Sequence, residues 1–282
     1  MIGLVFGWLG RLALCALLCG FSALALARLA RRGRERPTSI TAPAPLVVLL
    51  ALSLLLISRF LAPFLPSVAN PAHPWNLLPV AAGLGGALLL LFFCAPRPRW
   101  ILPRNERPGM RYALVAYASA LPALAGVYLV WRALADAQGL PTRHEILVGY
   151  SSLAPLPAFI TLLLTLGLMP ILEELIFRGW LFGSLSSDPR TGPLLALAIS
   201  SLAFGLSHQP GMWLPATALG LLFGWVYWRV GDVRAPILLH VLHNLGVLLW
   251  GRRLGAPPSR AENGPALRRN RSPARGRMGP WP

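Results

Sequence analysis

Eight apolar segments, each close to the length that crosses a membrane, constrain the fold of this chain more than any other feature. A membrane-spanning helix needs about 20 consecutive apolar residues. Within the hydrocarbon the backbone must satisfy its own hydrogen bonds, which favours helices. We therefore predict an all-α fold, a polytopic membrane helix bundle with about eight transmembrane helices, located in the cell membrane. The segments are 3–28, 44–66, 75–95, 112–134, 153–177, 191–208, 213–230 and 235–251.

Polar residues divide these segments into two groups. The first four segments contain few polar groups, whereas the last four contain nearly all of the unusual ones. We therefore predict a four-helix membrane scaffold over residues 1–140, a catalytic helix bundle over 141–251 and a tail over 252–282. The tail is rich in Pro, Gly and Arg, a composition typical of disorder.

The basic residues indicate a membrane protein rather than a nucleic-acid-binding protein. The formal net charge is +17, but the arginines collect in loops and in the tail beside apolar segments, as expected for cytoplasmic loops. We therefore expect membrane lipids as partners and no nucleic acid. Cys15, Cys19 and Cys94 form no Cys-x-x-Cys or Cys/His cluster that would indicate a metal site or a disulfide framework.

Glu173 and Glu174 are adjacent in an apolar segment of a chain that has only nine acidic residues. A carboxylate inside a membrane is costly and usually functional. Residues four apart share a helix face, so Glu174 can pair with Arg178 while Glu173 points elsewhere. Pro170 lies just upstream and is expected to bend the helix. The alternative interpretation is an ion pair at the membrane surface.

Two further motifs contain polar side chains on apolar helices. Phe204 precedes His208 by four residues, and His240 precedes Asn244 by the same interval. His243 lies beside the second pair. An apolar helix gains nothing from such side chains unless they find partners. We therefore expect them to line a polar cavity.

Hydrolysis fits this set of residues. A carboxylate and a histidine can deprotonate a water, while a second histidine and an amide stabilise the resulting oxyanion. The set could equally hold a divalent metal ion such as Zn²⁺ through Glu173, His208 and His240. No His-Glu-x-x-His helix and no Gly-x-Ser-x-Gly elbow is present in the sequence.

The order Glu173-Glu174-x-x-x-Arg178, Phe204-x-x-x-His208 and His240-x-x-x-Asn244 resembles the CPBP intramembrane metalloprotease family, which includes the type II CAAX prenyl endopeptidases. The resemblance implies an intramembrane endopeptidase but does not carry over a substrate. Our leading hypothesis is a peptide or lipidated protein substrate, cut near its C-terminus. Glu173 would act with His208 on water, and His240 with Asn244 would form the oxyanion site. It assigns supporting roles to Glu174, Arg178 and Phe204, and it leaves a metal-dependent and a metal-independent mechanism open.

Two other functions compete with the protease. A catalytically idle immunity or scaffold protein would have broken motifs, and a transporter or proton relay would need a polar path across the membrane. Straight helices place His208 and His240 at opposite ends of their segments. We therefore predict that residues 208–214, which include Pro210 and Gly211, turn within the membrane so that the site can assemble.

Overall fold

A computed structural model describes residues 70, 72–94, 109–140, 149–188 and 190–254. Every regular element in this part of the chain is helical, which confirms the all-α class for the described residues. The predicted segments 3–28 and 44–66, like residues 255–282 of the predicted tail, lie outside them. The division of the chain at residue 140 stays a prediction.

The six remaining apolar segments each correspond to a helix. The longest helix runs over Pro155–Ser187, well past the predicted end at residue 177. Gly231, whose φ of 68° is left-handed, ends α10, because a glycine takes this conformation without a Cβ clash. The other helices are α3 (Pro74–Cys94), α4 (Met110–Ala137), α9 (Gly192–Leu206), α10 (Trp213–Val230) and α11 (Arg234–Leu254).

The Pro155–Ser187 helix changes its winding along its length. Two segments are π-helical, and the short α-helical segment between them carries Glu173 and Glu174. Such π-helical segments are rare and are frequently found at functional sites. In order, the parts are α6 (Pro155–Leu162), η3 (Leu163–Leu168), α7 (Met169–Glu174), η4 (Leu175–Phe182) and α8 (Gly183–Ser187).

Two of the helices in the described residues are long and apolar enough to cross a membrane. They are Met110–Ala137, with 28 residues, and Pro155–Ser187, with 33. Shorter apolar helices cover Pro74–Leu89, Gly192–Leu206 and Arg234–Leu249. Length and composition therefore indicate a membrane protein, while the count of about eight spans stays a prediction.

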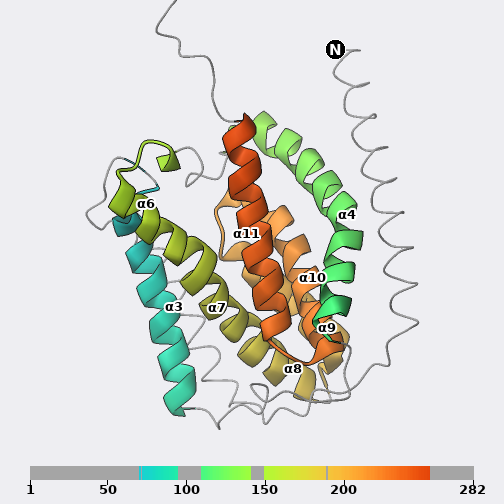
Figure 1. The fold of residues 1–282 in the computed structure, drawn as a ribbon. Helices are drawn as coiled ribbons and strands as arrows, with labels where there is room; N and C mark the ends of the chain where they lie inside the picture. Colours follow the sequence, from blue (N-terminus) through green and yellow to red (C-terminus); the bar gives the residue numbers. More distant parts are fainter. Residues whose placement is uncertain (1–69, 71, 95–108, 141–148, 189, 255–282) are drawn as a thin grey trace, which may run out of the picture.

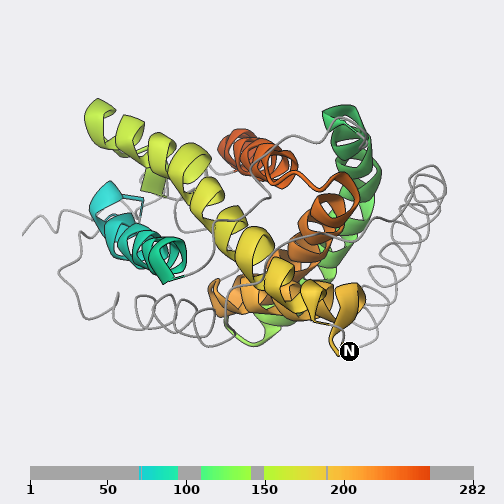
Figure 2. The ribbon, with the colours of Figure 1, turned by 90° about the horizontal axis from the view of Figure 1, so that it is seen from below.

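Helix α11 lies between α4 and the long helix that contains α7 (Figure 1), and it contacts both as well as α10. Helices α9 and α10 pack against each other and lie behind α11 in the view of Figure 1, and Figure 2 shows the same ribbon from below. One apolar core joins α3, α7, η4, α9 and α10, and a second joins α4, α10 and α11. The segments that carry the three motifs are thereby brought to one region.

Helices α9 and α10 pack closely through small residues. A Cβ on Gly220 would lie 3.1 Å from both Cα and O of Ser201, and one on Gly224 would lie 2.6 Å from Cδ1 of Leu197. A larger residue at Gly220 would require the Ser201 backbone to shift by a few tenths of an ångström. The Gly-x-x-x-Gly pattern of α10 therefore serves close backbone packing, as in membrane helix pairs.

The chain turns between α9 and α10, where the sequence predicts a turn over residues 208–214. A 3₁₀ turn over Pro210–Met212 follows His208 directly. Two indoles hold this turn: Trp131 Nε1 donates to the Gly211 carbonyl at 2.9 Å, and Trp213 Nε1 donates to the His208 carbonyl at 2.9 Å. The turn itself is as predicted; its depth in a membrane stays a prediction.

Candidate active site

Glu174 and Arg178 form the ion pair that their spacing predicts. Nε of Arg178 lies 3.0 Å from Oε2 of Glu174, and the two side chains are 1% and 0% exposed. The Nε–H is not directed at Oε2, so the contact is an ion pair rather than a hydrogen bond. The pair is therefore inside the protein rather than on its surface, and its depth in a membrane stays a prediction.

Arg178 is also held by the helices around it. Its Nη2 donates to the Gly220 carbonyl at 3.2 Å. Its guanidinium carbon lies 4.4 Å from the ring centroid of Phe204 and 5.7 Å from that of Phe223. A cation over an aromatic face is attracted by the ring quadrupole, more strongly when both are away from water. Phe204, predicted as a supporting residue, thus forms one wall around the arginine.

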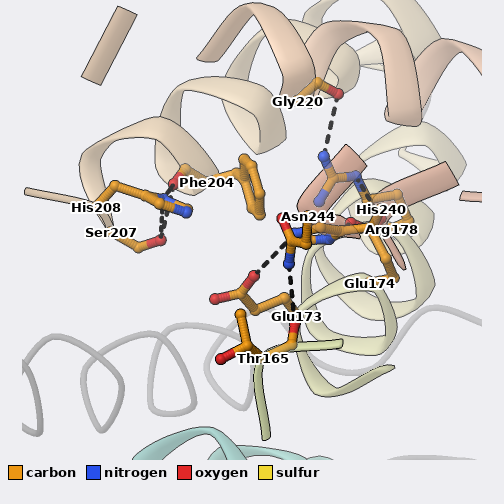
Figure 3. Close-up of polar contacts among 10 residues, drawn as sticks. All are labelled: Thr165, Glu173, Glu174, Arg178, Phe204, Ser207, His208, Gly220, His240 and Asn244. Carbon is orange, nitrogen blue, oxygen red and sulfur yellow. Dashed lines mark hydrogen bonds and ion pairs between the residues drawn. The ribbon is translucent and has the colours of Figure 1, made fainter. Parts of the chain in front are cut away.

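His240 on α11 reaches both carboxylates (Figure 3). Its Nδ1 lies 2.8 Å from Oε1 of Glu174, and its Nε2 lies 3.7 Å from Oε2 of Glu173. Because a carboxylate only accepts, the short contact places a proton on Nδ1. His240 and Glu173 are buried, at 4% and 5% exposure. The first and third motifs therefore meet in the interior.

Asn244 lies one turn along α11 from His240. Its side-chain Nδ2 donates to the Thr165 carbonyl at 3.0 Å, which ties α11 to the π-helical segment η3 (Figure 3). An asparagine amide has two N–H donors, and the Thr165 carbonyl uses one of them. Asn244 is half-buried.

His208 approaches this cluster across the Phe204 ring. Its ring centroid lies 4.8 Å from that of Phe204, and the Phe204 centroid lies 5.8 Å from that of His240. His208 Nδ1 lies 2.8 Å from the Phe204 carbonyl, which can only accept. The proton of a neutral His208 is therefore on Nδ1, and Nε2 is the basic nitrogen. His208 is half-buried, unlike His240.

Three residues outside the predicted set contribute to the site. The Thr165 carbonyl holds Asn244, and the Tyr117 hydroxyl on α4 lies 3.2 Å from Nδ1 of His243. Trp131, also on α4, holds the turn after His208. Pro170 signals in the sequence that a carbonyl one turn before it lacks a donor, but not that this carbonyl is the one of Thr165. Tyr117 and Trp131 have no comparable signal, because their contacts depend on how α4 packs.

The described residues do not form a ready metal site. Within them, no group of three or more His, Cys, Asp or Glu side chains is close enough together to hold an ion. Glu173, His208 and His240 therefore do not fit a three-ligand metal centre in this arrangement, and no step proposed below passes through a metal.

A family model described as "Type II CAAX prenyl endopeptidase Rce1-like" matches residues 155–246, about a third of the chain. The chain is similar to the membrane-embedded CAAX protease MroQ of Staphylococcus aureus (strain USA300), with 30% identity over 100 residues. It is also similar to the protein YdiL of Bacillus subtilis (strain 168), with 38% identity over 81 residues, and to the UPF0177 protein YxdF of Lactococcus lactis, with 34% over 80.

The family match covers the helices that carry the three motifs. The similarities to the three relatives take in 34%, 28% and 28% of this chain, and the chain spans only 40%, 32% and 42% of those relatives. No solved structure matches. By their descriptions, the matched family model and MroQ are CAAX-type proteases. The three motifs predict a resemblance to a family that includes the type II CAAX prenyl endopeptidases. The family match confirms this resemblance over residues 155–246.

Proposed function

We propose that this protein is an intramembrane endopeptidase in which Glu173 and His208 activate a water and His240 and Asn244 stabilise the oxyanion. The substrate would be a peptide or a lipidated protein, cut near its C-terminus. The observation that carries this proposal is the contact of His240 with both carboxylates inside the protein. Buried ionisable groups gathered from separate helices are expensive, and catalysis needs such groups.

The two carboxylates differ in their surroundings, which supports different roles. Glu174 lies within 3.0 Å of both Arg178 and His240, so its charge is matched in place. Glu173 lies 3.7 Å from His240, farther than a direct hydrogen bond. A water or a substrate oxygen can bridge two groups at such a distance. Glu173 is therefore the better candidate for the base.

In the proposed reaction His240 is a donor. For that role it must carry a proton on Nε2 as well as the one on Nδ1, and its ring then lies between the Glu173 and Glu174 carboxylates. That Nε2–H would face the side of Glu173, where a substrate carbonyl oxygen could accept it together with an N–H of Asn244.

In the proposed reaction Glu173 takes a proton from water, and the hydroxide attacks the peptide carbonyl carbon. Nε2 of His208, the basic nitrogen of its neutral ring, holds the water through a hydrogen bond. The oxyanion of the tetrahedral intermediate accepts from His240 and Asn244. Glu173 then returns its proton to the leaving amine as the C–N bond breaks. The products are an amine and a carboxylic acid, which releases its proton to solvent as a carboxylate.

The test compares Glu173→Gln with the wild-type chain in membranes and in purified form. Gln keeps the shape of the side chain and removes the base, so cleavage should be lost while thermal unfolding is unchanged. Asp188→Asn, the same chemical change at an exposed position, is the control. Mass spectrometry of membrane peptides would identify the new C-termini that appear only with active protein. Undiminished cleavage by Glu173→Gln would exclude the mechanism, and a chain without any cleavage product would favour an immunity or scaffold role.

A further inference from the structure

The Thr165 carbonyl is left without a helical donor by the winding of η3. The N–H of Met169 bonds to the carbonyl of Leu164, five residues back, as in a π-helix. In the same register the next carbonyl, that of Thr165, would be served by the N–H of residue 170. Residue 170 is proline, which has no N–H.

The side chain of Asn244 supplies the missing donor. Its Nδ2 donates to the Thr165 carbonyl at 3.0 Å from a helix that is remote in sequence. A buried carbonyl without a partner costs free energy, so the helix gains by accepting the amide. The bond also selects one orientation of the amide, because only its nitrogen can donate.

The backbone of the long helix therefore positions one side of the site. Thr165 and Glu173 lie eight residues apart. An α-turn of 3.6 residues and a wider π-turn together span about this interval, so the two residues are separated by about two full turns. The carbonyl that holds Asn244 is consequently on the helix face that carries Glu173. His240 lies one turn from Asn244 on α11 and faces the same carboxylate.

We propose that Pro170 is a positioning residue for Asn244: it withholds the N–H that would occupy the Thr165 carbonyl and so fixes the carboxamide beside Glu173 and His240. The effect on catalysis rests on the function proposed above, whereas the effect on Asn244 does not. Pro170 itself touches no reacting atom. The sequence also predicts that this proline bends the helix. The tests below distinguish the effect of the bend from the effect of the missing N–H.

The first test follows the Asn244 side chain directly. The full chain, labelled with ¹⁵N-asparagine in detergent micelles, gives side-chain amide signals, and the Asn244 signal is identified by its absence in Asn244→Ala. Pro170→Ala supplies the missing N–H, so this signal should shift toward that of a solvated amide. Pro122→Ala removes a proline inside α4 and should leave it unchanged. An unmoved Asn244 signal in Pro170→Ala would overturn the proposal.

A second variant distinguishes the effect of a donor supplied to the Thr165 carbonyl from the effect of a straightened helix. Pro170→Ala/Ile171→Pro keeps one proline in the helix but withholds the N–H of residue 171 instead of that of residue 170. Ile171 is 41% exposed, so its side chain can be changed with little loss of packing. We expect the Asn244 signal to move in this variant too. A wild-type signal would show that the bend alone matters, and it would overturn the proposal even if Pro170→Ala does not fold.

Turnover gives the catalytic readout. Pro170→Ala should lower kcat between about 10-fold and 100-fold with little change in KM, since misplacement of a catalytic group by about 1 Å can cost as much. Combined with Asn244→Ala, it should cost no more than Asn244→Ala alone, because both remove the same group from its place. Additive losses would overturn the positioning role. A moved Asn244 signal in a chain that cleaves nothing would instead count only against the proposed protease function.

Discussion

Nδ1 of His240 lies 2.8 Å from Oε1 of Glu174, the carboxylate whose other oxygen lies 3.0 Å from Nε of Arg178. One acid therefore joins the first and third motifs, across a separation of 66 residues. This leaves Glu173 as the carboxylate that faces the reaction, and it makes Glu174 an orienting group for the histidine.

We predict that Glu174→Gln lowers kcat at least about 100-fold with little change in KM, although Glu174 touches no substrate in the proposed reaction. A carboxylate that holds a histidine in its tautomer and stabilises its charged form is worth this much or more in hydrolases. Steady-state kinetics of the purified protein would measure it. A change confined to KM would mean that Glu174 contributes to binding instead.

Arg178→Ala should destabilise the protein by about 3–5 kcal/mol, because it leaves the fully buried Glu174 without its counter-charge. Thermal or denaturant unfolding in detergent would report it. Arg132→Ala is the matched control, since Arg132 pairs with Asp136 at 3.6 Å with both side chains about half exposed. Exposed pairs contribute about 0–1 kcal/mol. Equal unfolding of the two variants would contradict the buried pair.

Gly220→Ala should cost about 1–3 kcal/mol, because its Cβ would meet the backbone of Ser201 and push α9 from α10. The Gly220 carbonyl, which accepts from Arg178, would move as well. Gly246→Ala on α11 is the control, since its Cβ would meet nothing within 4 Å. An alanine at Gly246 should be neutral or slightly stabilising. Unchanged unfolding of Gly220→Ala would show that the two helices can separate at little cost.

Removal of divalent metal should leave cleavage intact, because the described residues offer no three-ligand cluster and the proposed steps use only protein groups and water. The measurement is the cleavage rate after dialysis against a strong chelator, followed by a metal assay. Addition of Zn²⁺ to the dialysed protein is the control. A loss that only Zn²⁺ restores would establish the metal-dependent alternative that the sequence leaves open.

The sequence predicts those parts of the site that depend on spacing along one helix. The pairing of Glu174 with Arg178 follows from their interval, and the turn after His208 follows from Pro210 and Gly211. The bond from His240 to Glu174 does not follow, because it depends on how α11 rotates against the long helix. The π-turns escape prediction for a related reason: apolar periodicity gives the face of a helix and not its local hydrogen-bond register.

Pro170 is a residue for which the sequence predicts one effect and the structure reveals a second. From the sequence it predicts a bend, and the structure shows that the carbonyl it leaves vacant also matters, through the bond from Asn244 to Thr165. That carbonyl lies five residues before the proline rather than four. The difference of one residue is set by the winding of η3, which becomes visible only once the helices are packed.

The turn that carries His208 is held by two indoles, and one of them, Trp131, belongs to α4, outside the family-matched residues 155–246. A shortened or chimeric protein limited to the matched residues would lose that donor. Any such version would need a replacement group for the Gly211 carbonyl if His208 is to keep its place opposite Phe204.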